Sequence, residues 1–292
     1  MPLSTFSIVA VDLATGELGV AVASKFLAVG AVVPWARAGV GAVATQSYAN
    51  VSYGPTGLEL MAAGHSAGET LARLLADDPE RELRQVGIVD ARGGTATFTG
   101  SACHAWAGGR TGPGYAVQGN ILTGPEVVDA MAHAFETTDG PLAVRLLAAL
   151  AAGDAAGGDR RGKQSAALLV VKERGGYGGY TDRFIDLRVD DHVEPVAELQ
   201  RLYGIWRLYF EKPAPEDRLP LEGALLVELQ ELMRVLGYYQ GPVHGQWDEA
   251  TRRAYTALIG NENFEERIPL DADWIDRAVL EYLRELARRR QG

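Results

Sequence analysis

A threonine at the start of the first strand-like segment offers the clearest catalytic chemistry in this sequence. Thr5 opens a β-rich stretch over residues 5–11, the chain turns at 14–17, and it returns over 18–24 to end at Lys25. This pattern predicts a hairpin with a lysine at its far end. If Thr5 became the N-terminal residue, its Oγ would be a nucleophile, and its α-amine, with an ordinary pKa of about 8, would be the general base. The charge of Lys25 would tune both groups.

Two serines belong to the same predicted hairpin. Ser7 lies two residues after Thr5 on the same strand, so its side chain points to the same face. It is therefore the rival nucleophile if Thr5 keeps the residues that precede it. Ser24, next to Lys25, is expected to point the other way.

Side-chain amides in or beside glycine-rich turns are candidate hydrogen-bond donors. Gln46, Asn50 and Asn120 are of this kind, and each could stabilise an oxyanion or bind a substrate. Amides in loops also form turns without any catalytic role. Both interpretations stay open at this point.

Two glycine-rich motifs match known catalytic loops in letters but not in context. Residues 64–68 satisfy Gly-x-Ser-x-Gly, yet a helix-like segment precedes them, and Ser66 with Glu69 predicts a helix capping box instead. Residues 157–163 nearly match a phosphate-binding loop, but Gln164 replaces the hydroxyl that would hold Mg²⁺, and a helix stands where a strand is required. Residues 64–68 therefore do not predict a hydrolase nucleophile, and residues 157–163 do not predict a phosphate-binding site.

Several segments resemble one bacterial protein family. They are Thr5–Ala10, Gly19–Phe26, Ala44–Gln46, Gln118–Asn120, Gly157–Ser165 and Asp190–His192. On these segments, residues 5 to about 195 resemble the uncharacterised domain-of-unknown-function family number 1028, which is placed by fold with the N-terminal-nucleophile (Ntn) hydrolases. The resemblance implies an α+β fold, namely a four-layer αββα sandwich with two antiparallel sheets between helical layers.

The resemblance also implies roles for individual residues. In Ntn hydrolases an N-terminal Thr, Ser or Cys attacks an amide carbonyl and forms a covalent acyl-enzyme, so Thr5 would be the nucleophile and Lys25 the lysine that closes the second strand. The family's glycine-rich loop, residues 157–165 here, faces the site, and backbone N–H groups would hold the oxyanion. The candidate substrate and oxyanion residues are Thr45, Gln46, Asn50, Gly119, Asn120, Asp159, Gln164 and Ser165.

One feature departs from the Ntn pattern. Residues Met1 to Ser4 precede Thr5, and removal of the methionine alone would expose Pro2. Thr5 becomes N-terminal only through further processing or a different true start.

Charge and composition exclude several classes of function. The formal charge of −10 argues against non-specific binding to nucleic acid or to an anionic membrane. The single cysteine, Cys103, excludes an intramolecular disulfide and a cysteine-based metal site. No apolar run is long enough to span a bilayer, and no signal peptide follows Met1. We therefore expect a cytoplasmic protein that needs no cofactor and no metal.

The predicted elements are grouped rather than alternating. Strands are expected at 5–11, 18–24, about 30–34, 39–46, 84–90, 94–99, 166–172 and 184–189, and helices at 55–63, 66–77, 125–137, 141–153 and 193–210. This grouping favours an α+β fold over a doubly wound parallel sheet.

A polar, proline-bearing stretch at residues 211–217 predicts a domain boundary. The expected domains are residues 1–212, the Ntn-hydrolase-like part, and residues 213–292, a small helical part. In the second, one apolar helical face ends before Gly237; its members are Leu225, Leu229, Leu232, Met233 and Leu236.

The segment after this helix resembles a small peptidoglycan-binding-like module. A Gly-Tyr-Tyr turn at residues 237–239, a further glycine and Trp247 stand at the spacings of that module. An aromatic turn serves core packing as readily as sugar binding, so a peptidoglycan fragment stays an open partner.

Two functions therefore compete. The first is an Ntn-type amidohydrolase that acts on a small amide or peptide through Thr5. The second is a non-catalytic protein that keeps the Ntn scaffold and uses its C-terminal module for cell-wall glycan or for self-association. A homo-oligomer is compatible with both.

Overall fold

The computed structural model describes residues 5–291 and contains two compact units, the first ending at Leu202 and the second beginning at Tyr203. The predicted domain limits, 1–212 and 213–292, stay a prediction, because a division by compactness does not define a folding unit. No helix within residues 5–291 is both long and apolar enough to cross a membrane.

The first unit is built around a six-stranded antiparallel sheet, in which β1 and β2 form the predicted hairpin. Its order is β10-β9-β2-β1-β8-β7, with β1 (Thr5–Asp12), β2 (Glu17–Ser24), β7 (Gly108–Gly112), β8 (Tyr115–Asn120), β9 (Ser165–Val171) and β10 (Arg183–Val189). At the hairpin turn, Asp12 Oδ1 accepts a hydrogen bond of 2.9 Å from Ala14 N, and Gly16 adopts a φ of 73°, a left-handed conformation that glycine enters at little cost.

A second sheet faces the first. Its order is β3-β4-β5-β6, with β3 (Pro34–Arg37), β4 (Gly41–Ser47), β5 (Arg84–Asp90) and β6 (Thr95–Thr99). Between the sheets lies a layer of small and branched apolar side chains, to which β1, β2, β4, β5, β8 and β9 all contribute. Because side chains alternate along a strand, each of these strands gives only every second residue to this layer.

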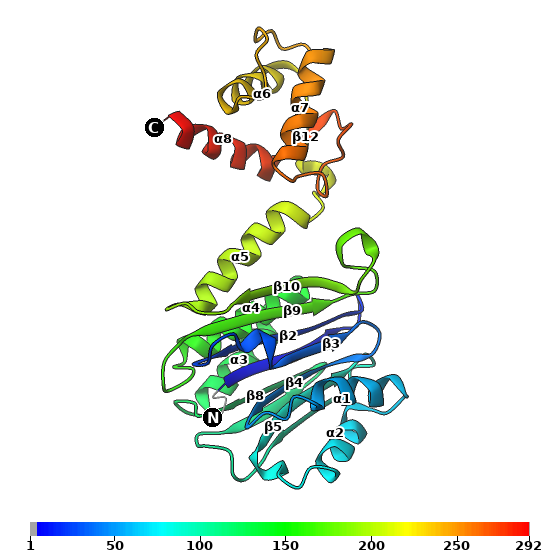
Figure 1. Ribbon diagram of the computed structural model, residues 1–292, viewed down its shortest axis with the longest axis vertical. Coiled ribbons are helices and arrows are strands. Elements are labelled where there is room, and N and C mark those ends of the chain that lie inside the picture. The colour runs from blue at the N-terminus through cyan, green and yellow to red at the C-terminus, as the bar shows by residue number, and fades with distance from the viewer. Residues whose placement is uncertain (1–4, 292) are drawn as a thin grey trace. The chain divides into compact units, whose positions relative to one another are not determined.

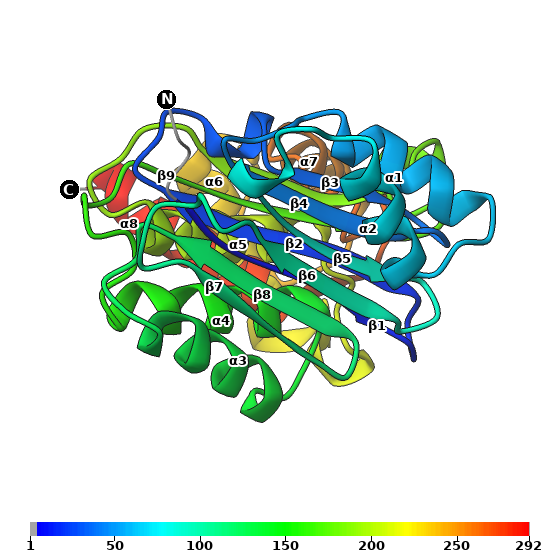
Figure 2. The same cartoon turned by 90° about the horizontal axis from the view of Figure 1, so that it is seen from below.

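Helices cover the outer face of each sheet (Figures 1 and 2). Helices α1 (Tyr53–Ala62) and α2 (Ala67–Ala76) pack on the four-stranded sheet, and α3 (Glu126–Thr137) and α4 (Leu142–Ala155) pack on the six-stranded sheet. The predicted capping box at Ser66 and Glu69 is confirmed at the start of α2. The unit is thus a mixed fold of antiparallel sheets and helices, which agrees with the α+β prediction.

The structure differs from the sequence prediction at two places in this unit. The expected strand at about 30–34 is a short 3₁₀ helix over Val29–Ala31 followed by β3, because an uninterrupted apolar run does not distinguish a strand from a buried turn. The hairpin of β7 and β8 was not predicted, because its glycines weaken the strand pattern. Other short 3₁₀ helices are Arg81–Leu83, Tyr177–Gly179 and Pro215–Asp217.

The second unit is helical, with its own core. Helix α5 (Pro195–Phe210) ends in it, and α6 (Gly223–Leu236), α7 (Glu249–Asn261) and α8 (Arg277–Gln291) follow, with a two-stranded ribbon of β11 (Arg218–Pro220) and β12 (Trp274–Asp276). Helix α6 ends at Gly237, whose φ of 89° gives the left-handed cap that was predicted.

Candidate functional site

Thr5 lies in the middle of the six-stranded sheet, at the first position of β1. It is directly opposite Ser24 of β2 and Asn120 of β8 in the strand register. Its side chain is fully buried, and its Oγ1 donates to Ser24 Oγ over 3.3 Å. The expectation that Ser24 points away was wrong, because residues directly opposite each other in an antiparallel pair share a face of the sheet.

At the Thr5 end, the layer between the sheets changes from apolar to polar. Its amide layer consists of Gln46, Gln85, Gln118 and Asn120, each with no exposed surface. Ser7 is held within this layer, since its Oγ donates to Gln46 Oε1 over 2.6 Å and accepts from Gln118 Nε2 over 2.6 Å. The hydroxyl of Ser7 is therefore already committed, which weakens its standing as the rival nucleophile.

Gln85 is the hub of the amide layer. Its Oε1 accepts from Gln46 Nε2 over 2.8 Å and from Asn120 Nδ2 over 2.9 Å, and its Nε2 donates to Gly119 O over 2.7 Å. Gln46 Nε2 also donates to the carbonyl of Thr5 over 3.3 Å. A chain of amides thus runs from the four-stranded sheet to the backbone of the candidate nucleophile.

The close approach of the two sheets requires a glycine at position 87. A Cβ there would lie 2.0 Å from Gln118 Oε1, so any larger residue would displace this amide. The sequence interpretation missed both Gln85 and Gln118. The usable signal was the alternation of β5, in which Gln85, Gly87 and Val89 all point toward the other sheet.

A polar group without a hydrogen bond is costly inside a protein, about 1–3 kcal/mol for each group. Gln46, Gln85 and Gln118 meet this requirement through bonds to one another, to Ser7 and to backbone carbonyls. A network of this kind is rigid, because each amide can turn only if its neighbours turn as well.

Lys25 lies at the predicted place but does not reach Thr5. Its exposed Nζ donates to Lys163 O over 3.2 Å, and its backbone N–H donates to Asp159 Oδ2 over 2.8 Å. The buried carboxylate of Asp159 also pairs with Arg161 over 3.0 Å. Asp159 therefore fixes the turn that follows β2.

The other two candidates from this loop stabilise the same region. Ser165 is opposite Ser24 in the register of β2 and β9; its Oγ donates to Phe26 O and accepts from Val29 N. Gln164 donates through its backbone N–H to Ser24 O over 3.1 Å, and through its side chain to Asp191. Both residues shape the chain beside Thr5 without contacting the Thr5 side chain.

Lys163 gives this loop a further ionic anchor. Its Nζ lies 2.7 Å from Asp154 Oδ2 and 2.6 Å from Glu194 Oε2, and these hydrogen bonds, the one with Asp154 above all, raise the pKa of Lys163. A cavity of about 80 Å³ lies between this loop and β2, where Ser24 and Phe6 also line it.

Thr45 lies on the opposite face of β4 from Gln46, and Asn50 lies in the loop after β4. Thr45 N donates to Val33 O over 3.2 Å, and its Oγ1 donates to Asn50 O. Asn50 Nδ2 donates to Asp78, a carboxylate that also pairs with Arg84 over 2.9 Å. The structure therefore separates these two candidates from Thr5, because adjacent residues of a strand face opposite ways.

Asp78 is the centre of a separate polar cluster beneath α1. The hydrogen bond from Arg84, supported by that from Glu80 N, holds the pKa of Asp78 well below its usual range. Burial, followed by the hydrogen bond to Asp78, raises the pKa of Tyr53. All these groups are partners of one another, which is typical of a structural cluster.

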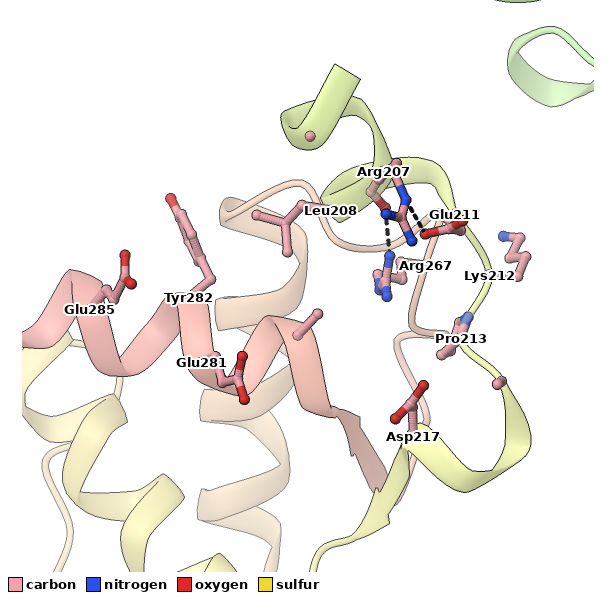
Figure 3. A pocket seen from close by; sticks show the side chains of 13 residues that line it. Arg207, Leu208, Glu211, Lys212, Pro213, Asp217, Arg267, Glu281, Tyr282 and Glu285 are labelled. Atoms are coloured by element: carbon pink, nitrogen blue, oxygen red, sulfur yellow. Dashed lines mark hydrogen bonds and ion pairs between the residues drawn. The ribbon is translucent and has the colours of Figure 1, made fainter. Parts of the chain in front are cut away.

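The second unit contains a cavity of about 680 Å³ between the end of α5 and α8 (Figure 3). Arg267 is almost fully buried there; it donates to Arg207 O over 2.6 Å and pairs with Asp276 over 3.1 Å. Arg207 in turn pairs with Glu211 over 2.8 Å. These bonds link segments of the unit, so the charged groups serve its stability.

No group of three or more His, Cys, Asp or Glu side chains is arranged to hold a metal ion in residues 5–291. Met1 to Ser4, whose removal the Ntn mechanism requires, lie outside the described residues.

Comparison with known proteins identifies both parts of the chain. Residues 5–199 match the "Family of unknown function (DUF1028)", and residues 209–283 match the "Putative peptidoglycan binding domain". A crystal structure of a protein of the first family from Silicibacter pomeroyi is 32% identical, with a TM-score of 0.64, over 70% of this chain and 89% of that one.

A weaker likeness is to the ancestral β-subunit Anbu from Yersinia bercovieri, over 70% of this chain and 94% of that one. At 11% identity and a TM-score of 0.31, it supports no inference. No curated protein matches the chain. Over residues 5–199, the chain belongs to the family of unknown function DUF1028.

Proposed function

We propose that the first unit is an Ntn-type amidohydrolase with Thr5 as its nucleophile. The observation that carries the proposal is the position of Thr5, at the first residue of a central strand, where an otherwise apolar layer between two sheets becomes a rigid network of amides. The helix-covered sheets are compatible with the αββα sandwich expected of such an enzyme.

The proposed reaction needs only the groups of an N-terminal Thr5 and water. The α-amine takes the hydroxyl proton as Oγ1 attacks the amide carbonyl, and it returns that proton to the leaving amine when the C–N bond breaks. The same amine then takes a proton from water as the water attacks the ester, and it returns that proton to Oγ1 when the acid is released. Gln46 positions Thr5 because its Nε2 donates a hydrogen bond to the carbonyl oxygen of Thr5.

The oxyanion donor stays a prediction. The candidate donors are the backbone N–H groups near Thr45 and Gln46 or near Gly119, and the N–H of Thr45 donates to Val33 O in this structure. A donor of this kind contributes about 3–4 kcal/mol to the reaction barrier. Lys25 acts at most through its charge, because its ammonium is bonded to Lys163 O.

The test begins with the intact mass and N-terminal sequence of protein purified without an N-terminal tag. We expect a mature chain that begins at Thr5, and hydrolysis of a small amide that Thr5→Ala abolishes. Thr15→Ala, at the exposed turn of the same hairpin, is the matched control and should retain activity. A chain that keeps Met1 or Pro2, or undiminished hydrolysis by Thr5→Ala, would refute the proposal.

A second candidate function is glycan binding by the C-terminal module. The match of residues 209–283 to a peptidoglycan-binding domain favours it. Purified peptidoglycan sacculi should recover the full chain, whereas an equal mass of cellulose should not. Equal recovery by both materials would show non-specific adsorption and exclude this function.

A further inference from the structure

The aromatic turn after α6 does not supply a sugar-binding surface. Tyr238 donates through its hydroxyl to Glu262 over 2.8 Å, and Tyr239, which is 4% exposed, donates to Pro242 O over 3.0 Å. Both rings pack against the core of the unit. If this module binds a glycan, other residues must form the site.

A cavity of about 610 Å³ lies along α7 and the segment of residues 270–273 of the module. This volume is in the range of ligand sites, about 300–1,000 Å³. One wall is Trp247, a half-buried ring that stands edge-on against the buried ring of Tyr255 at 5.5 Å between centroids. Tyr255 is itself fixed by a hydrogen bond of 2.7 Å to Trp274 O. Trp247 is thus held in a defined orientation.

Charged side chains in this cavity are not neutralised by neighbours. Arg252, Asp271 and Asp273 line it and are exposed, and their side chains form no ion pair or hydrogen bond with any residue in the range 5–291. In the cavity of Figure 3, by contrast, the two lining arginines, Arg207 and Arg267, are both paired. The Trp247 cavity therefore keeps hydrogen-bonding capacity for a ligand.

An apolar surface adjoins these charges. Leu270, which lines the cavity, is 46% exposed. Together with Trp247 it offers a ligand apolar contact beside polar groups, the combination that small-molecule sites use for affinity and orientation.

We propose that this cavity binds the glycan strand of peptidoglycan, with a sugar ring on Trp247; the proposal rests on the glycan-binding function of the module. Carboxylates only accept hydrogen bonds and guanidinium groups only donate them. The ligand must therefore present donors to Asp271 and Asp273 and an acceptor to Arg252. Sugar hydroxyls and an acetamido carbonyl provide both, while the C–H face of the ring packs on the indole.

The charge of the cavity argues against an anionic ligand. Two of its three free charged groups are carboxylates, and the whole chain has a formal charge of −10. A nucleic acid or a phosphate-rich polymer would be repelled. A strand of N-acetylated amino sugars, without a charge on its backbone, avoids this cost.

The experiment uses the full chain with two probes, purified sacculi and the β-1,4-linked tetramer of N-acetylglucosamine. We expect calorimetry to detect binding of the tetramer, and Trp247→Ala to weaken it at least tenfold. Asp271→Asn and Arg252→Ala, at exposed positions that leave the core intact, should each weaken it as well. Tyr180→Ala removes an aromatic ring that is 91% exposed in the first unit, and it should bind as the wild type does.

The outcomes separate the site from the function. Binding to sacculi with unchanged tetramer affinity in Trp247→Ala, Asp271→Asn and Arg252→Ala would overturn the site and leave glycan binding standing. Binding to sacculi but not to the tetramer would show that the ligand is not the glycan strand and would point to the peptides of peptidoglycan instead. No binding to either probe would overturn the glycan-binding function, and the site with it.

Discussion

Replacing Gln85 by leucine tests the amide layer directly. The substitution keeps a similar volume but removes the partner of Gln46 Nε2 at 2.8 Å, Asn120 Nδ2 at 2.9 Å and Gly119 O at 2.7 Å. At about 1–3 kcal/mol for each buried group that loses its bond, three groups give about 3–9 kcal/mol. Gln46 keeps bonds of 3.3 Å to Thr5 O and Gln118 O, so we expect the lower part of this range, about 3–5 kcal/mol.

A loss of this size is a large part of the stability of a domain, about 5–15 kcal/mol. Hydrogen exchange of the full chain, followed by mass spectrometry, measures this loss of stability for individual peptides. Peptides from β1, β4, β5 and β8 should exchange at least a hundredfold faster in Gln85→Leu. Gln200→Leu, at an exposed position of α5, is the matched control. Equal exchange in the two variants would show that Gln85 does not hold the layer together.

Three further perturbations probe other parts of the structure. Gly87→Ala should destabilise the first unit measurably in thermal unfolding, because its Cβ would lie 2.0 Å from Gln118 Oε1; an unchanged melting temperature would contradict this. Because the pKa of Asp78 is depressed in the folded state, its contribution to stability is complete above an unfolded pKa of about 4 and is lost as pH falls through the folded pKa. The free energy of unfolding of Asp78→Asn should therefore fall less steeply below about pH 4 than that of the wild type. Parallel curves of unfolding free energy against pH would contradict this role of Asp78. Removing one partner of a buried ion pair costs about 3–5 kcal/mol, so Arg267→Ala should destabilise the second unit strongly. Arg253→Ala, in an exposed pair, should cost under about 1 kcal/mol. Similar hydrogen-exchange rates of the second unit in the two variants would refute a structural role of the Arg267–Asp276 pair.

Much of the candidate site follows from the sequence, but its geometry does not. The pattern of strand and turn residues placed Thr5 and Lys25 at the same end of a hairpin, as observed. It could not give the direction of Ser24, because that depends on the register, which the sequence leaves open by one residue. The direction of the Lys25 side chain was equally open, and in the structure its ammonium donates a hydrogen bond to Lys163 O.

The amide layer shows a different limit. Gln46 and Asn120 were recognised as amides near glycines, whereas Gln85 was not, because it lies inside an ordinary strand. Its importance comes from β8, which pairs with β1 and brings Gly119 and Asn120 over β5. No feature within a few residues of Gln85 indicates that neighbour.

Features set by neighbouring residues were determined by the sequence alone. These include the hairpin turn at Asp12–Gly16, the capping box of α2 and the glycine that ends α6. Each depends on hydrogen bonds or backbone angles within one turn of chain, so no distant partner is needed. Only the tertiary structure decided which side chains meet between the sheets and which charged residues gather around the Trp247 cavity. Those outcomes depend on contacts between segments far apart in the chain, whose choice rests on the packing of whole faces.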